Sequence, residues 1–295
     1  MISRFTIRLS FFLFMGGLIS ACAINPYAAT NKSYKKQVKT YARSLRTIPG
    51  DNPDEDTLRQ GDYWVGTTNF NMRKANFVVI HHTAQHSTAQ TLKTFTIPKT
   101  QVSAHYVIGR DGKVYHMLND YLRSWHAGVG KWGNNTDLNS SSIGIELDNN
   151  GIEPFPATQI NSLLQVLALL KKNHQIPAAN FIGHSDIAPT RKTDPNALFP
   201  WQQLAENGYG MWYDDIVPDT VVVMDSTGLA ADTVVKYNIP ENFNPAEALR
   251  IIGYDISNLE AAIRAFKLHF VQQDLTAILT EEDKRILYSL YKKYL

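Results

Sequence analysis

The feature that most restricts the fold of this chain is a helical repeat of apolar residues between short β-type runs. The repeat comprises Ile160, Leu163, Leu164, Leu167 and Leu170. Lys171 and Lys172 follow it, where cations favour the end of a helix. Apolar, partly β-branched runs at residues 77–80, 143–147 and 181–183 lie on both sides. Such alternation predicts an α/β fold, a mixed central β-sheet flanked by helices.

A hairpin is expected at one part of this sheet. Residues 106–108 and 114–117 are extended in pattern, and Arg110-Asp111-Gly112-Lys113 between them is a turn signal. The two runs should therefore pair as antiparallel neighbours.

Composition limits the classes of function. The chain has 295 residues, of which 44% are hydrophobic and 19% charged, as in ordinary globular proteins. Its formal net charge is +2 and no basic patch stands out, so the sequence predicts no nucleic-acid partner.

The N-terminus has the pattern of an export signal. Arg4 and Arg8 precede an apolar stretch at residues 9–19, and the small residues Ser20 and Ala21 follow. The apolar stretch is short for a membrane span. We therefore predict a signal peptide at residues 1–21.

Cys22 is the only cysteine, so a disulfide within the chain is excluded. A free thiol is the ordinary interpretation, but Ile19-Ser20-Ala21-Cys22 resembles the bacterial lipobox. The resemblance implies lipidation of Cys22, which would hold the chain at a membrane. Because Ala23 rather than Asp follows, the expected location is the outer membrane, facing the periplasm.

The remaining domain boundaries follow from composition. Residues 22–60 are polar without a sustained apolar period and are interpreted as a tether, and residues 61–215 carry the α/β pattern. Residues 216–240 form an unassigned connector. Residues 241–295 predict a three-helix domain that docks against the first, with helices at 245–252, 257–270 and from 280. Gly253 should end the first helix, and Thr280 with Asp283 forms a capping box.

The histidines suggest a metal site. Catalytic zinc is commonly held by three protein ligands, often neutral histidines and carboxylates. His81 and His82 end an apolar strand, and Asp194 follows His184 after ten positions. Neighbours on a strand point to opposite faces, so only one of His81 and His82 can enter a given site. Alternation does not say which, and a structural role is the ordinary reading for each.

Three motifs in order carry a family resemblance. They are Val79-Ile80-His81-His82-Thr83-Ala84, Ser142-Ile143-Gly144-Ile145-Glu146-Leu147, and Gly183-His184-Ser185-Asp186-Ile187-Ala188-Pro189 with Arg191-Lys192-Thr193-Asp194-Pro195. Together they resemble the zinc N-acetylmuramoyl-L-alanine amidases related to animal peptidoglycan recognition proteins. The likeness spans about residues 60–215. The C-terminal helices resemble a peptidoglycan-binding domain.

The resemblance implies one zinc ion held by His81, His184 and Asp194, with water at the fourth position. It also implies that Glu146 is the catalytic acid and base, and that Lys192 stabilises the oxyanion. An edge-strand carboxylate and a solvated loop charge are the plain alternatives for these two residues.

Trp125, His126 and Trp132 lie on a glycine-rich stretch and are expected to line a substrate groove. His105, His116 and His174 are expected to be structural, and His269 to be a packed core residue. Ala104 precedes His105 where phage members of the family carry tyrosine, so no tyrosine role transfers and proton transfer falls to Glu146.

The resemblance implies cleavage between the lactyl group of N-acetylmuramic acid, intact or anhydro, and L-alanine of the stem peptide. Peptidoglycan and muropeptides are the expected partners, and no protein partner is predicted. A non-catalytic peptidoglycan-binding protein is the alternative. A metallopeptidase lacks support from any His-Glu-x-x-His sequence. Deletion beyond Pro240 is expected to weaken wall binding and to spare hydrolysis of small muropeptides.

Overall fold

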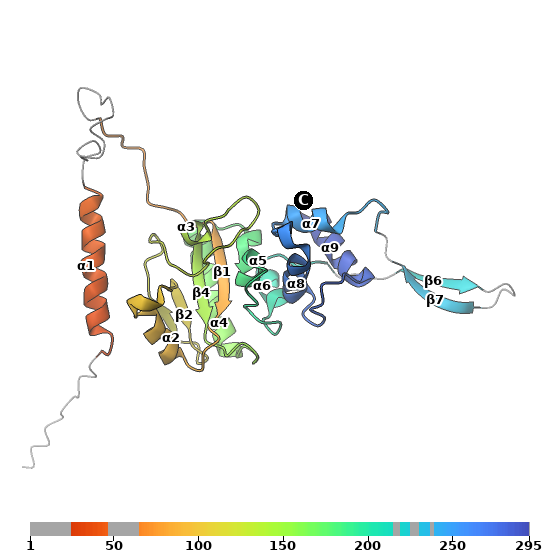
Figure 1. Cartoon of the computed structure of the whole chain (residues 1–295), viewed down its shortest axis with the longest axis horizontal. Helices are drawn as coiled ribbons and strands as arrows, with labels where there is room; N and C mark the ends of the chain where they lie inside the picture. The colour runs from red at the N-terminus through yellow and green to blue at the C-terminus, as the bar shows by residue number, and fades with distance from the viewer. Residues whose placement is uncertain (1–24, 47–64, 215–218, 225–229, 237–238, 295) are drawn as a thin grey trace, which may run out of the picture. The chain divides into compact units, whose positions relative to one another are not determined.

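The computed structural model describes residues 25–46, 65–214, 219–224, 230–236 and 239–294 (Figure 1). The predicted signal peptide and Cys22 lie outside these residues. The chain divides into two compact units, Met1–Thr68 and Asn69–Leu295, which are described separately.

The regular element among the described residues of the first unit is the helix α1, Ala28–Ser44, with no buried side chain. The segment interpreted as a tether therefore contains a helix over this range. Ala, Lys, Gln and Arg supply much of the segment, and these residues have high helix propensity.

The second unit is built on a five-stranded sheet in the order β3-β2-β4-β1-β5. Its strands are β1 (Phe77–His82), β2 (Tyr106–Ile108), β3 (Val114–His116), β4 (Ser142–Leu147) and β5 (Phe181–Gly183). β3 pairs antiparallel with β2, and the other neighbours are parallel. The predicted mixed sheet and its hairpin are confirmed.

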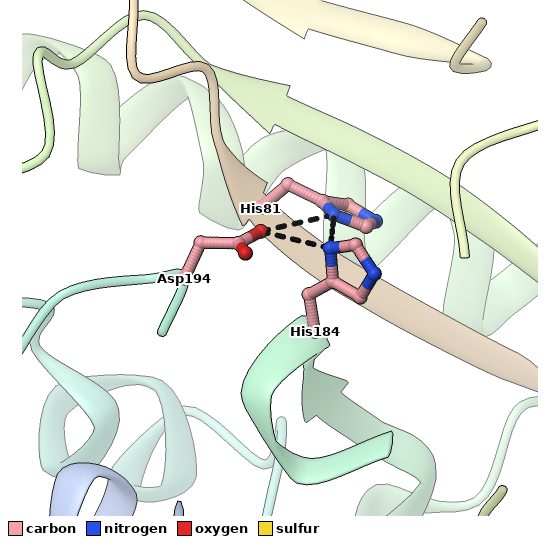
Figure 2. A group of neighbouring side chains, drawn as sticks. All are labelled: His81, His184 and Asp194. Atoms are coloured by element: carbon pink, nitrogen blue, oxygen red, sulfur yellow. Dashed lines mark hydrogen bonds and ion pairs between the residues drawn. The ribbon is translucent and has the colours of Figure 1, made fainter. Parts of the chain in front are cut away.

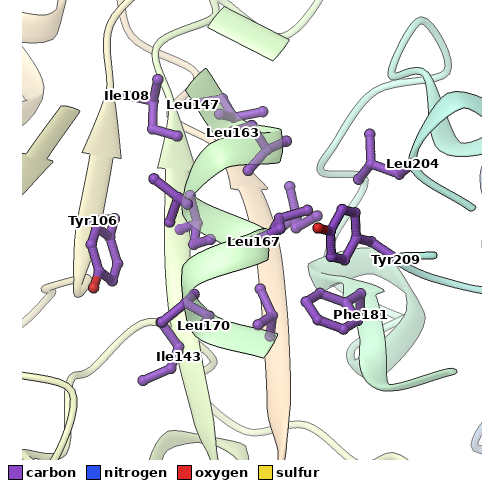
Figure 3. Close-up of a cluster of buried hydrophobic side chains, with 14 of the residues drawn as sticks. Tyr106, Ile108, Ile143, Leu147, Leu163, Leu167, Leu170, Phe181, Leu204 and Tyr209 are labelled. Carbon is purple, nitrogen blue, oxygen red and sulfur yellow. The ribbon is translucent and has the colours of Figure 1, made fainter. Parts of the chain in front are cut away.

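One face of the sheet is covered by the predicted long helix, α4 (Ala157–His174) (Figure 3). Leu163 and Leu167 of this helix are fully buried in one cluster with Ile80 and Ile145 of the central strands. The helical repeat of the sequence is thus the surface that packs on the sheet.

The opposite face is covered partly by the C-terminal helices. These are α7 (Pro245–Ile252), η4 (Ile256–Asn258), α8 (Leu259–Phe270) and α9 (Glu281–Tyr294). Val79 of β1 and Ile182 of β5 share one buried cluster with Phe266 and Leu287 of these helices. The expected docking of the helical segment is confirmed, and it takes the form of a common hydrophobic core.

The ends of these helices follow the sequence signals. The Asp283 N–H donates to Thr280 Oγ1 over 3.1 Å, and the Thr280 N–H donates to Asp283 Oδ2 over 2.8 Å. The predicted capping box is therefore present. Gly253 ends α7, as expected, with a φ of +139°.

The shorter elements complete the description. They are α2 (Thr88–Phe95), η2 (Pro98–Thr100), α3 (Leu138–Ser141), η3 (Ala178–Asn180), α5 (His184–Ile187), α6 (Trp201–Glu206), and the antiparallel pair β6 (Asp219–Met224) and β7 (Ala230–Lys236). This last pair lies in the connector that the sequence left unassigned. Among the described residues, none of the helices has both the length and the apolarity needed to cross a membrane.

Candidate metal centre

The site begins where two parallel strands end side by side. His81 of β1 is in register with Glu146 of β4. Both side chains lie on the face of the sheet opposite the one that α4 covers. Since the carboxyl ends of parallel strands meet at one edge of a sheet, both side chains reach a common region. His184 starts α5 directly after the neighbouring strand β5.

Three ligand atoms converge at this edge (Figure 2). His81 Nδ1 lies 2.9 Å from His184 Nδ1 and 3.2 Å from Asp194 Oδ2, and His184 Nδ1 lies 3.0 Å from that oxygen. All three residues are buried. Two nitrogen or oxygen ligands of one tetrahedral zinc ion lie about 3.3 Å apart. The donor set and its spacing therefore fit a zinc ion after a small expansion.

The remaining nitrogen of His184 identifies its tautomer. His184 Nε2 lies 3.1 Å from the carbonyl oxygen of Ala127, which can only accept a hydrogen bond. Nε2 therefore carries the proton, and Nδ1 presents a lone pair to the centre. This arrangement is typical of metal-bound histidine.

A longer relay orients His81 in the same way. Ser142 Oγ donates to the carbonyl oxygen of Leu138, and accepts from His126 Nε2 over 3.0 Å. His126 Nδ1 is then left to accept from His81 Nε2 over 2.9 Å. The proton of His81 is thereby held on Nε2, so its Nδ1 also presents a lone pair.

Burial keeps both imidazoles of the relay neutral. It lowers the pKa of His81 to about 4, with a further contribution from His184, and it lowers the pKa of His126 well below its ordinary value. Two lone pairs and a carboxylate oxygen consequently meet in a buried space. Such an arrangement is unfavourable unless a cation binds between them.

The choice between His81 and His82 is made by the sheet. His82 points to the other side of β1, where its Nδ1 accepts from the backbone N–H of Asn196 over 3.1 Å. It does not contribute to the three-atom group, which His81 completes.

Glu146 supplies a carboxyl group beside the ligands. Its Oε2 is buried and has no hydrogen-bond partner among the described residues. Burial raises the pKa of Glu146 to about 8, the charge of Asp194 adds to this effect, and Lys192 opposes it. The group can therefore hold a proton near neutral pH and release it to a neighbouring base.

Two adjoining cavities of about 390 and 480 Å³ form a groove over the site. Trp125, His126 and Lys192 line both, and Glu146 lines the smaller one. Trp125 is 52% exposed, so its indole is available to a ligand. His126 also lines the groove, but both of its ring nitrogens already form hydrogen bonds, with His81 and Ser142. Its role is therefore to orient His81.

The expectation that Trp132 lines the groove is wrong. Its side chain is 7% exposed and packs edge-on against Tyr254, with ring centroids 5.0 Å apart. A Cβ at Gly253 would lie 2.5 Å from the indole, so the α7 terminus closes over this residue. Trp132 is part of the core shared with the C-terminal helices.

The other histidines have the structural positions expected of them. His116 and His174 each contact the carboxylate of Asp120, at 3.1 and 3.3 Å. His105 is fully buried, and its Nε2 lies 3.0 Å from the carbonyl oxygen of Leu122. His269 is buried against Trp201, with ring centroids 3.8 Å apart.

The sequence analysis missed the supporting residues of the site. Ser142 and Gly144 precede Glu146 on β4, and a Cβ at Gly144 would lie 2.4 Å from Cγ of His126. Glycine at this position is therefore required for the His126 ring to lie against the strand. The small residues Ser142 and Gly144, at alternate positions before Glu146, were the sequence signal that could have indicated a side chain packed against this strand.

The profile of the N-acetylmuramoyl-L-alanine amidase family matches residues 71–197, which include all the residues of this centre. The chain is also 32% identical over 240 residues to N-acetylmuramoyl-L-alanine amidase AmiD of Escherichia coli, covering 74% of this chain and 82% of the relative. This chain belongs to the N-acetylmuramoyl-L-alanine amidase family.

Two solved structures support the assignment of this chain to the family. The complex of E. coli AmiD with the substrate anhydro-N-acetylmuramic acid-L-Ala-D-gamma-Glu-L-Lys superposes with a TM-score of 0.61 and 28% identity, covering 81% of this chain and 94% of that one. AmpDh3 of Pseudomonas aeruginosa gives a TM-score of 0.63 at 29% identity, covering 80% of this chain and 98% of that one.

A shorter relative matches part of the chain. The 1,6-anhydro-N-acetylmuramyl-L-alanine amidase AmpD of Haemophilus influenzae is 36% identical over 108 residues, which are 36% of this chain and 59% of that protein. The matches to AmiD and AmpDh3 extend well beyond this length.

Proposed function

We propose that this protein is a zinc-dependent N-acetylmuramoyl-L-alanine amidase. It cleaves the amide between the lactyl group of N-acetylmuramic acid and L-alanine in peptidoglycan or muropeptides. The observation that carries the proposal is the convergence of His81, His184 and Asp194 beside the unpartnered carboxylate oxygen of Glu146. The substrate named in the AmiD complex supports this choice of amide.

The three ligands would hold one zinc ion, which supplies Lewis acidity and lowers the pKa of a bound water toward about 7. His81 and His184 are presented to it as neutral ligands by the Ala127 carbonyl and the His126 relay. Asp194 provides negative charge in the buried site, and zinc ligation by a carboxylate is common in such enzymes.

Glu146 is assigned the proton transfers. As the water oxygen bonds to the amide carbon, a proton passes to Glu146 Oε2. When the carbon–nitrogen bond breaks, the same proton passes to the leaving nitrogen of L-alanine. A buried carboxyl group with its pKa raised to about 8 can hold the proton between these steps.

Lys192 is assigned the role of stabilising the negative charge that develops on the carbonyl oxygen. Its side chain lines both cavities, and its charge acts on Glu146 and His81. An ammonium group close to the reacting bond stabilises the tetrahedral intermediate more strongly than the ground state.

The groove accounts for substrate binding. Trp125 offers an exposed indole face suited to sugar or peptide, and it lines both cavities beside the metal ligands. We infer that intact and anhydro forms of N-acetylmuramic acid both enter; the substrate in the AmiD complex is an anhydro form.

We also propose that the protein is a lipoprotein, anchored through Cys22 at the outer membrane and facing the periplasm. The lipobox-like sequence and Ala23 after the cysteine support this location. Metabolic labelling with a fatty-acid analogue, with Cys22→Ala as control, tests it.

The activity is tested by digesting purified sacculi and muropeptides and identifying the products by mass spectrometry. Release of intact stem peptides is expected, and cleavage of cross-bridges would refute the assignment. Asp194→Ala should lose stoichiometric zinc and activity together. Binding to sacculi without any product would show a recognition protein instead.

A further inference from the structure

The helix α1 is amphipathic although it belongs to no core. Tyr34, Val38 and Tyr41 lie on it at intervals of four and three residues, and Leu45 follows four residues later at its C-cap. This spacing places them in one stripe along the helix. Val38, Tyr41 and Leu45 are 36%, 48% and 77% exposed.

The rest of the helix surface is strongly basic. Residues 23–50 contain no Asp or Glu, and their cations are Lys32, Lys35, Lys36, Lys39, Arg43 and Arg46. At 100° per residue, Lys32, Lys36 and Lys39 fall opposite the apolar stripe. One side of α1 is therefore apolar and aromatic, and the other carries only positive charge.

We propose that α1 is a membrane-surface helix that lies in the headgroup region of an anionic phospholipid bilayer. An amphipathic helix with a Lys/Arg-rich polar face and aromatic or aliphatic residues opposite has the composition of interfacial helices. Each Lys or Arg near an anionic surface strengthens binding, and the apolar stripe enters the acyl boundary.

The length of chain before α1 agrees with this location. Ala28 lies six positions after Cys22, and a fully extended chain spans at most about 3.5 Å per residue. If Cys22 is lipidated, as proposed above, α1 begins within about 20 Å of the membrane. The lipid and the helix would then both attach the chain to the same membrane.

A bilayer also explains how the helix is stabilised. An isolated helix of this length is marginal in water, and no side chain of α1 is buried. Burial of the apolar stripe at an interface supplies the missing stabilisation.

The test uses the chain beginning at Ala23, so that neither the leader nor a lipid contributes. Sedimentation with vesicles of phosphatidylglycerol and phosphatidylethanolamine is compared with phosphatidylcholine vesicles at low salt and at 0.5 M salt. Binding to the anionic vesicles is expected, with loss in high salt. Equal binding to phosphatidylcholine, or no binding at all, would overturn the proposal.

Two variants address the two faces. Lys32→Gln/Lys36→Gln/Lys39→Gln preserves helix propensity and should weaken vesicle binding about 100-fold. Val38→Ala/Tyr41→Ala should weaken it at least tenfold, because an interfacial helix is held by its apolar area as well as by charge. Circular dichroism checks that helicity is retained.

The matched control removes the same charge elsewhere. Lys99, Lys172 and Lys292 are exposed in the second unit, and their joint replacement by glutamine should leave vesicle binding within twofold. A loss as large as that of the α1 triple variant would show a nonspecific charge effect. Pelleting with sacculi through the α1 lysines, without vesicle binding, would assign the helix to the wall. Amidase activity on soluble muropeptides is measured in parallel. A failure of the proposed catalytic function can then be distinguished from a failure of the proposed membrane binding by α1.

Discussion

Nε2 of His81 lies 2.9 Å from Nδ1 of His126, so one ligand of the candidate metal centre is oriented by a hydrogen bond to a second buried imidazole. The relay ends at the carbonyl oxygen of Leu138, through the hydroxyl group of Ser142. Because a carbonyl can only accept, the direction of every proton in the relay follows from this end. The lone pair that His81 offers to a metal is thus determined by residues that do not touch the metal.

His126→Phe should weaken zinc binding by 10- to 100-fold, because His81 Nε2 would lose its acceptor and its orientation. Competition against a chromophoric chelator measures the affinity. His174→Gln is the matched control, since His174 is equally buried but contacts Asp120 away from the centre. Unchanged affinity in His126→Phe would show that the relay does not position His81.

Gly144→Ala tests the packing of the relay. The added Cβ would lie 2.4 Å from His126 Cγ, which forces the ring away from β4. We expect a loss of zinc affinity in the same range as for His126→Phe. A variant that folds and binds zinc as tightly as the parent would contradict the tight fit.

Glu146→Gln gives a pH-dependent change in stability. In the zinc-free protein, burial raises the pKa of Glu146 from 4.5 to about 8. Between these two values the unfolded chain binds fewer protons than the folded one, so this group lowers the stability as pH rises. Glutamine does not ionise, so the advantage of the variant should grow from pH 4.5 to 8 and then stay constant.

Urea unfolding of chelator-treated protein at pH 5, 6.5, 8 and 9 measures this advantage. An advantage that does not change with pH would refute the raised pKa. With zinc bound, the variant should retain the metal and lose most of its turnover, because the proton acceptor is gone.

Tyr254→Phe tests how the C-terminal helices are tied to the metal site. The Tyr254 hydroxyl donates to Asp186 Oδ1 over 2.9 Å, and Asp186 lies two residues after His184 in α5. Loss of this donor leaves a buried carboxylate oxygen unpaired, which should cost about 1–3 kcal/mol in the free energy of unfolding. Tyr121→Phe, at a 47% exposed side chain, should change it by less than about 0.5 kcal/mol.

Deletion of the residues beyond Pro240 should abolish activity on small muropeptides as well as on sacculi. Val79 and Ile182 pack directly against the C-terminal helices, so the truncated chain would expose one face of the central sheet. This outcome differs from the expectation drawn from the sequence, which treated the helices as a separable module. Full activity of a soluble truncated protein would restore that view.

Local patterns in the sequence determined much of the fold. The leucine repeat predicted α4, the β-branched runs predicted the strands, and capping residues predicted the ends of α7 and α9. These features depend on residues within a few positions of one another. The helix α1 was missed although its signal is also local, because the polar composition around it was taken for a tether.

The tertiary structure decided the questions that depend on distant residues. The face of β1 that lies away from α4 carries His81 rather than His82, so His81 lies beside His184 and Asp194. The parallel pairing of β1 with β4 places Glu146 in register with it. The closure of the α7 terminus over Trp132 removed that residue from the groove. Periodicity shows that a strand has two faces, but only the elements packed on each face determine which one becomes the core and which one carries the chemistry.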